Sequence, residues 1–498
     1  MRRGDFTADT FDPRKRFASV LRQQGRVDLD ADFNEQSDIF RELMRNLARD
    51  LIGPHGGAAP GFEITIESSD DEISDLLIER GHYYVDGILC ANDDAPAPCD
   101  AAATPASSPL SYLHQPDYRL LSQAQRAFPK LPFQVYLDVW ERFICAAEDD
   151  SIREVALGGP DTGGRTQMVW QVRLRAVNEP ASACSVEGLW ALGGGCLSAR
   201  ADAGEDDTDP CLCPPDARYR GHENQLYRVE LHRGGSAWNG IDAEDRNSNA
   251  ADAATFKWSR DNASVVFPVL GFEGSVVTLE YLGRDRRTDL VEGDLIEIEY
   301  EAVTLGPHDP PGASTGAFSP PPLLTVKAID RQAGTVTVAG DLGEVTEAMR
   351  ATATVVRRWD RPAGAPALGG EGQAADGSTL IAEGDWLELE DGVQVRFEAL
   401  QDPRPYRAGD YWLIPARTAT GDVIWPRAAD GTPQPQAPRG VVHHYAPLGL
   451  ITGADPKTGF QDCRCTITPL AKCPPAAAAG RPRPARRATR SRSAATDQ

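Results

Sequence analysis

The residues with the clearest potential for chemistry are cysteines and histidines near the end of the chain. Cys463 and Cys465 are separated by one residue, Cys473 follows them, and His443 and His444 lie upstream. Thiolates and imidazoles are the natural ligands of zinc. A Cys-x-Cys pair lacks the two-residue spacer of common zinc sites, so we expect no bound metal. Unpaired cysteines are the favoured interpretation, and disulfides formed late are the alternative.

The other cysteines give no stronger signal. Cys211 and Cys213 form a second Cys-x-Cys pair in a long loop, and Cys184 and Cys196 flank a glycine-rich segment. An occasional crosslink is compatible with that spacing. A nucleophilic cysteine needs a base beside it, and no partner histidine is in view. We therefore predict no catalytic cysteine.

Two segments match functional motifs in their letters alone. Gly312-Ala-Ser314-Thr-Gly316 has the spacing of a nucleophile elbow, but the prolines around it prevent the strand, turn and helix that expose such a serine. Gly370-Glu-Gly372-Gln-Ala-Ala375 resembles a dinucleotide fingerprint, yet it follows a Pro-rich segment rather than a strand. We predict no catalytic residue and no cofactor, and we do not expect an enzyme.

Acidic residues raise the question of calcium. Asp28, Asp30 and Asp32 alternate as at the start of a calcium loop, but helix sequence replaces the glycine that such a loop requires. Asp32 lies three residues before Glu35, which is the spacing of a helix capping box. We therefore predict helix capping here, and a solvated loop for the acidic run at 205–209.

Three tryptophans offer a different chemistry. Trp258, Trp412 and Trp425 lie in segments that read as strands or turns, and exposed rings of this kind could stack on sugars. Packing in a β core is the favoured interpretation. A solvent-facing cluster of the three would instead favour a carbohydrate-binding module.

One long amphipathic helix is predicted over Asp32 to Ile52. Apolar positions recur about every four residues with charges between them, and Gly53-Pro54 supplies the stop. We expect the apolar stripe to be buried on one side, and Glu42, Arg45 and Arg49 to face water or a partner. The apolar positions are Phe33, Ile39, Phe40, Leu43, Met44, Leu47, Ala48, Leu51 and Ile52.

Beyond the helix, apolar and polar residues alternate, as is typical of half-buried strands. In one segment Tyr227, Val229 and Leu231 alternate with Arg228, Glu230 and His232. Asp391-Gly392 is a hairpin turn signal, with Val393, Val395 and Phe397 on the returning strand. Other strands are expected over 133–139, 169–174, 324–329, 335–338 and 411–414.

The order of these elements predicts a mainly β, multidomain protein. We expect an N-terminal amphipathic helix followed by antiparallel β modules, either small barrels or sandwiches, with long loops and a disordered basic tail after Cys473. The segments 292–299 and 383–390 match in residue type, which indicates either a duplicated β domain or a recurrent Gly-Asp strand entry. The expected domains are 1–60, 61–255, 256–350, 351–455 and 456–498.

Composition excludes several classes of protein. The chain has 498 residues, with 51 Lys and Arg against 74 Asp and Glu, a formal net charge of −23. Such a charge disfavours binding to nucleic acid. No apolar run approaches the ~20 residues of a membrane-spanning helix, and no secretory signal is apparent at the start. We expect synthesis in the cytoplasm.

Several longer motifs resemble an uncharacterised bacterial family encoded with phage-tail-like contractile injection systems. The likeness covers roughly residues 1 to 455. The motifs are Phe11-Asp-Pro13, Leu21 to Gln36, Ile152 to Asp161, Glu223 to His232, Phe256 to Asn262 and Gly409 to Thr418.

The resemblance implies a baseplate-region or tail-accessory structural protein and transfers no site residue. Its partners would be baseplate, tube or sheath subunits, with the chain oligomeric in a particle that cell lysis releases. A surface glycan or receptor is the alternative partner. A carbohydrate- or receptor-binding module is the alternative function, and a polysaccharide-cleaving enzyme ranks below both.

Overall fold

The structure is a computed structural model. It describes residues 2–70, 72–93, 108–118, 126–177, 184–187, 189, 193–202, 218–241, 245–283, 285, 287–306, 320–339, 345–361, 372–374, 376–400 and 404–468. The predicted motif around Ser314, residues 370, 371 and 375 of the motif around Glu371, the acidic run 205–209, Cys211, Cys213, Cys473 and the basic tail lie outside these residues. No helix in the described part of the chain is long and apolar enough to cross a membrane.

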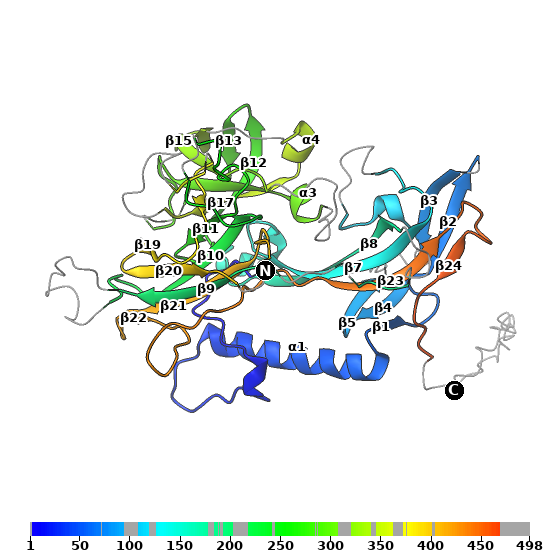
Figure 1. The fold of residues 1–498 in the computed structure, drawn as a ribbon, viewed down its shortest axis with the longest axis horizontal. Coiled ribbons are helices and arrows are strands. Elements are labelled where there is room, and N and C mark those ends of the chain that lie inside the picture. Colours follow the sequence, from blue (N-terminus) through cyan, green and yellow to red (C-terminus); the bar gives the residue numbers. More distant parts are fainter. Residues whose placement is uncertain are drawn as a thin grey trace, which may run out of the picture.

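The prediction of a mainly β, multidomain architecture is confirmed, and antiparallel sheets form the body (Figure 1). One lobe contains three sheets around a shared core in which Phe62, Phe133 and Trp170 are buried. The first sheet joins β1 (His55–Gly57), β4 (Gly81–Val85) and β5 (Ile88–Asn92). The second joins β2 (Ile64–Ser69), β3 (Glu72–Ile78) and β6 (Leu110–Ser111). The third has the order β24 (Phe460–Asp462), β23 (His444–Ile451), β7 (Phe133–Ile144) and β8 (Arg165–Ala176).

The second lobe is built on two further sheets that share a core containing Phe256, Trp258 and Trp412. The larger sheet has the order β18 (Thr379–Leu380), β11 (Thr255–Ser259), β10 (Gln225–Arg233), β21 (Tyr411–Arg417) and β22 (Asp422–Val423). The smaller one has the order β19 (Leu387–Glu390), β20 (Val393–Glu398) and β9 (Cys196–Ala201).

A closed six-stranded barrel packs on this lobe, and its interior holds Phe267, Ile298 and Val356. Antiparallel pairing of β12 with β17 closes it. The barrel order is β12 (Val266–Glu273), β13 (Val276–Leu279), β16 (Thr335–Ala339), β15 (Leu324–Asp330), β14 (Leu295–Tyr300) and β17 (Ala353–Trp359).

The short helices of the described residues are η1 (Pro13–Lys15), η2 (Tyr112–His114), η3 (Asp150–Ile152), η4 (Val155–Leu157), α3 (Glu301–Thr304) and α4 (Glu347–Arg350).

Strands from distant parts of the chain share sheets. β7 pairs with β23, more than 300 residues later, and β10 pairs with β21. The predicted segments 61–255 and 351–455 are therefore interwoven, whereas the barrel is contiguous and lies within 266–359. The two matching segments enter β14 of the barrel and β19 of the three-stranded sheet. Gly293 and Gly384 have nearly equal φ angles, +95° and +97°. Because one of the strands that follow belongs to a closed barrel and the other to a three-stranded sheet, the shared feature is a local strand entry and not a repeated domain.

The predicted hairpin at Asp391-Gly392 is confirmed, because β19 and β20 pair across it. Both turn residues have positive φ, as a tight primed turn requires. The prediction that the strand over 133–139 is half-buried is wrong, since Gln134 and Asp138 of β7 are 0% exposed, and so is the same prediction for β10. Its polar residues Arg228, Glu230 and His232 are at most 2% exposed, like the apolar ones between them.

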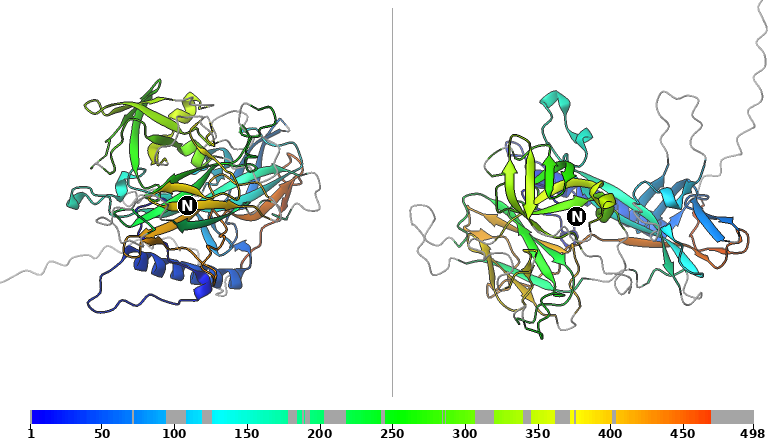
Figure 2. Two further views of the ribbon diagram at one scale, coloured as in Figure 1. Left: turned by 60° about the vertical axis from the view of Figure 1, so that its left-hand side comes forward. Right: turned by 90° about the horizontal axis from the view of Figure 1, so that it is seen from above.

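The long helix α1 (Asp30–Ile52) lies along the outer edge of the molecule (Figures 1 and 2). Its predicted end is confirmed, since Gly53 has φ +97° and its N–H bonds to the carbonyl of Arg49. The predicted capping box is wrong. The helix begins two residues earlier than expected, at Asp30, and Leu29 occupies the N-cap position without a side-chain hydrogen bond.

Candidate assembly surface

Helix α1 is held on the body by its polar face. Asp38 is buried and accepts a hydrogen bond of 2.7 Å from Arg2, and Arg41 lies 3.3 Å from the same carboxylate. Arg41 and Arg45 also pair with Glu141 of β7, at 3.5 Å and 2.5 Å. The hydrogen bond to Asp38 raises the pKa of Arg2. Ion pairs therefore anchor the side of the helix that we expected to face water or a partner.

Backbone packing and the N-terminal segment reinforce this anchor. Gly87, in the turn between β4 and β5, has φ +77°, and a Cβ there would lie 2.2 Å from the carbonyl oxygen of Arg45. Only glycine allows so close an approach. The side chain of Asp30 accepts a hydrogen bond from the backbone N–H of Thr7, and Gln36 accepts one from Val20. The helix is thus fixed to the body along its length.

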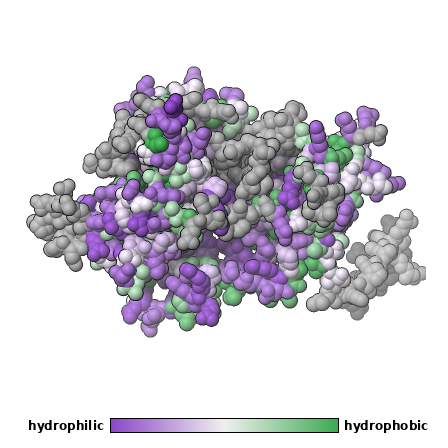
Figure 3. Space-filling view, in the orientation of Figure 1, coloured by the Kyte–Doolittle hydropathy of each residue, from purple (hydrophilic) through white to green (hydrophobic). Residues whose placement is uncertain are grey.

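Most of the apolar stripe of α1 points away from the body, so the prediction that the stripe is buried holds for Ile39, which is 2% exposed, and is wrong for the larger part. Six large apolar side chains on this face are between 50% and 77% exposed. They recur at the spacing that places residues on one side of a helix. Green apolar residues interrupt the purple hydrophilic surface along the lower edge of the molecule, where α1 lies (Figure 3). The residues are Phe33, Phe40, Leu43, Met44, Leu47 and Leu51.

The segment that precedes the helix adds to this face. Phe17, Leu21, Val27 and Leu29 are between 48% and 84% exposed. Summed with the six helix residues, they expose on the order of 1,000 Å² of apolar surface. We call these ten residues the α1 face. Its size is that of a protein interface, which buries about 800 Å² on each partner.

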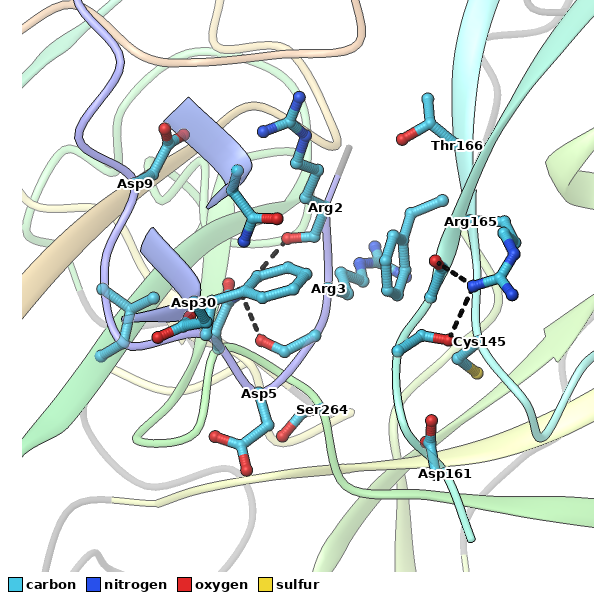
Figure 4. A pocket seen from close by; sticks show the side chains of 18 of the residues that line it. Arg2, Arg3, Asp5, Asp9, Asp30, Cys145, Asp161, Arg165, Thr166 and Ser264 are labelled. Atoms are coloured by element: carbon cyan, nitrogen blue, oxygen red, sulfur yellow. Dashed lines mark hydrogen bonds between the residues drawn. The ribbon is translucent and has the colours of Figure 1, made fainter. Parts of the chain in front are cut away.

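A cavity of about 950 Å³, lined by both polar and apolar side chains, lies between the N-terminal segment, α1 and the start of β8. Arg2, Arg3 and Asp5 line one side and Arg165 lines the other (Figure 4). Asn262 donates hydrogen bonds to the carbonyls of residues 2 and 4, which fixes the N-terminal wall. Burial raises the pKa of Asp5.

Cys145 contributes a thiol to the wall of that cavity. Burial, with a smaller contribution from Glu148, raises the pKa of its thiol to about 11. A reactive cysteine requires the thiolate at neutral pH. Cys145 is therefore protonated, and its environment is not that of a catalytic thiol.

The most concentrated group of charges is buried where β10 and β11 meet the barrel. Arg3 pairs with both Glu230 and Glu299. Arg228 lies 2.6 Å from Glu230. The remaining pairs are Lys257 with Glu297 at 2.6 Å and Arg357 with Glu299 at 2.8 Å. We call these seven residues the buried ion network.

Every member of the buried ion network has an oppositely charged partner. Burial would raise the pKa of Glu299, but Arg357 and Arg3 outweigh it and lower the pKa to about 2. The same competition, with Arg3, Arg228 and Lys257 as the cations, lowers the pKa of Glu230. Glu230 and Glu299 are therefore ionised at neutral pH and bound to fixed cations. This arrangement joins barrel, sheet and N-terminal segment, and it leaves no free acid or base for catalysis among these seven residues.

The cysteines are arranged differently from the expectation. Cys184 and Cys463 form a disulfide with a Cα–Cα distance of 5.3 Å, so the favoured interpretation that Cys463 is unpaired is wrong. Disulfides were the alternative, but the spacing pointed to Cys196 and not to a residue 279 positions away. Cys196 and Cys465 are free thiols.

The two histidines bind carboxylates. His443 lies 2.7 Å from Asp138 and His444 lies 2.8 Å from Asp86. Within the described ranges, no group of three or more His, Cys, Asp and Glu residues is placed to hold a metal ion. Cys463 is bonded to Cys184 and the two histidines bind aspartates, so the Cys-x-Cys and His-His segments do not form a shared metal site.

The three predicted aromatic residues are in the core. Trp258, Trp412 and Trp425 are at most 9% exposed and belong to one cluster. The indole N–H groups of Trp412 and Trp425 bond to backbone carbonyls of Gln436 and Gln434. Core packing, the favoured interpretation, is confirmed, and these rings are not a platform for sugars.

Comparison with known proteins identifies a family. A model of a family of unknown function, DUF6519, matches residues 1–189 and 185–486. No curated protein and no solved structure gives a significant match. The matched residues include α1 and all the strands described above.

Proposed function

The chain belongs to the DUF6519 family of unknown function, and we propose that it is a structural subunit of a larger protein assembly that it joins through the α1 face. The assembly we favour is a phage-tail-like contractile injection system, with the chain in the baseplate region or associated with the tail. The chain acts there by position and contact, and catalyses no reaction.

The observation that carries this proposal is the orientation of α1. An amphipathic surface helix normally turns its apolar stripe toward the core. Here ion pairs to Arg2 and Glu141 hold the polar side inward, and Phe40, Leu47 and Leu51 are exposed. Apolar side chains at intervals of three, four and seven residues are the anchors by which a helix docks on a protein partner.

The kind of assembly rests on the sequence motifs. The segment from Leu21 to Gln36, which resembles the injection-system family, contains the start of α1 and part of the α1 face. A second motif, Glu223 to His232, contains β10 with its buried charges. The resemblance therefore includes both the proposed contact surface and the strand that ties the barrel to the body.

Fractionation of a native lysate tests the proposal. We expect the chain to sediment with sheath and tube subunits, and the double variant Leu43→Asp/Leu47→Asp to remain in the light fraction while still folded. The matched control is Leu270→Asp/Ile424→Asp, which places the same charges at exposed apolar residues of the barrel and of the β22 region. The control should sediment like the wild type.

Two results would contradict the proposal. The wild-type chain could stay in the light fraction while sheath and tube sediment, or the α1 variant could sediment as well as the control. Binding of the purified chain to surface glycans would support the alternative of a carbohydrate- or receptor-binding module. Cleavage of a glycan would support an enzyme.

A further inference from the structure

Four of the six exposed apolar residues of α1 match in type when the helix is reversed about Glu42, whereas Leu43 and Leu47 fall opposite Arg41 and Ser37. Phe33 and Leu51 lie nine residues on either side of Glu42, and Phe40 and Met44 lie two residues on either side. A two-fold contact requires that one surface patch match its own reverse. In an antiparallel pair of such helices, each phenyl ring would meet an aliphatic side chain of the other copy.

We infer that the partner at the α1 face is a second copy of this chain, packed with its α1 antiparallel about a two-fold axis near Leu43. This inference rests on the proposed function, because it names the occupant of the same surface. With 23 residues, α1 is about 35 Å long. The contact is therefore a helix pair flanked by the segments that contain Phe17 and Leu21.

The exposed area agrees with a dimer. Each copy would contribute on the order of 1,000 Å² from the α1 face, against the about 800 Å² that each partner buries in a stable interface. α1 is an outermost element of the described chain in two views of the molecule (Figures 1 and 2). A second helix can therefore lie along it.

Charge along the helix favours the antiparallel direction. Asp30, Asp32 and Glu35 lie in its first two turns, whereas Arg49, followed by Asp50, lies in its last turn. A parallel pair would align the acidic ends of both copies. The antiparallel pair also opposes the two helix dipoles, with the acidic start of one helix beside the end of the other.

Other occupants fit less well. The segment from Pro474 to Gln498 contains no Leu, Ile, Val, Met or aromatic residue, so it offers no large apolar side chain to cover the stripe. An anionic membrane surface would repel a chain with a net charge of −23. The same charge opposes a second copy, and salt screens that repulsion. Dimer formation should therefore strengthen as salt is raised.

Sedimentation velocity on the purified full chain gives the first test. We expect a reversible dimer whose dissociation constant falls with added salt. Leu47→Asp should raise that constant by more than about 100-fold, because the pair would bury two unpartnered carboxylates. Leu270→Asp should leave it unchanged. A chain that is monomeric at every concentration would overturn the inference, as would a dimer that is insensitive to Leu47→Asp.

Cysteine crosslinking tests the direction of packing. In a Cys465→Ser background, Leu43→Cys lies beside its own copy near the axis, and a short bismaleimide should join the two chains. Leu51→Cys would be about 27 Å from its copy in the antiparallel pair and should not react beyond the background chain. Equal crosslinking at both positions would indicate a parallel pair and overturn the inference. Flotation of a monomeric chain with phosphatidylglycerol vesicles would overturn it in favour of a membrane.

The outcomes separate this inference from the proposed function. A chain that sediments with sheath and tube through the α1 face but is monomeric when pure would retain the function and reject self-pairing. A chain that forms the antiparallel dimer but stays in the light fraction beside sedimenting particles would do the reverse.

Discussion

Strand β10 and helix α1 both invert the usual distribution of polar and apolar residues, and they do so in opposite senses. In β10, Arg228 and Glu230 are buried; in α1, Phe40 and Leu47 are exposed. The inversion in β10 is compensated inside the chain, because each charge has a partner there. The inversion in α1 has no such compensation in the described residues. A buried charge with its partner indicates internal construction, whereas an exposed apolar stripe indicates a contact still to be made.

Removing a carboxylate from the buried ion network should have the largest effect. Glu230→Ala leaves Arg228 without its ion pair in a fully buried position. We expect the free energy of unfolding to fall by about 3–5 kcal/mol, measured by urea denaturation. Glu292→Ala, at an exposed carboxylate before β14, should change it by less than about 0.5 kcal/mol. If both variants lowered the free energy of unfolding equally, the buried ion network would contribute no more to stability than an exposed carboxylate does.

The disulfide is a covalent link within the chain and gives the next largest effect. Cys184→Ser should lower the free energy of unfolding by about 2–4 kcal/mol under non-reducing conditions, because it opens a bond between residues 279 positions apart. Cys465→Ser removes a free, exposed thiol and should have little effect. If Cys184→Ser unfolds like the wild type, the crosslink does not contribute to stability.

A buried carboxylate whose burial is only partly offset by a cation should make the stability of the fold depend on pH. Burial raises the pKa of Glu390 to about 7, and Arg260 offsets this only in part. Folding therefore favours the protonated acid, and its contribution to stability is lost as pH rises from about 4.5 through 7. Relative to Glu390→Gln, we expect the wild type to lose on the order of 1–2 kcal/mol between pH 5 and pH 8. Thermal unfolding at a series of pH values measures this, and parallel curves for the two proteins would contradict it.

The smallest effect on stability is expected at α1. Leu43→Asp/Leu47→Asp changes two side chains that are 54% and 53% exposed. The melting temperature of the monomer should stay within the range of surface substitutions, about 0.5 kcal/mol, although association is lost. A large drop in the melting temperature would mean that the stripe packs within the chain, and the comparison with β10 would fail.

The features that could be predicted from the sequence are local ones. Alternation over 133–139 and 411–414 predicted β7 and β21, and the turn at Asp391-Gly392 predicted the hairpin, because neighbouring residues determine these patterns. The stop of α1 at Gly53 was equally local.

The features that could not be predicted depend on residues far apart. Periodicity showed which residues of α1 share a face, but it could not show that Glu141 would draw the charged face inward. Likewise, the alternation of polar and apolar residues in β10 predicted that one face of the strand is exposed to solvent. That face is buried because its charges find partners far away in the chain, such as Arg3 for Glu230, 227 residues away. The partner of Cys184 was hidden for the same reason.

The double ion pair of Arg3 has a consequence for the order of events during synthesis. Its partners Glu230 and Glu299 lie 227 and 296 residues further along the chain. At about 5–20 residues per second, a ribosome needs roughly 15–60 s to make the intervening chain. During that time the N-terminal segment lacks its final partners, and α1 has neither a fixed Arg2 nor a completed barrel beside it. The apolar stripe is therefore presented to chaperones, or to a neighbouring nascent chain, before the body that anchors the helix exists.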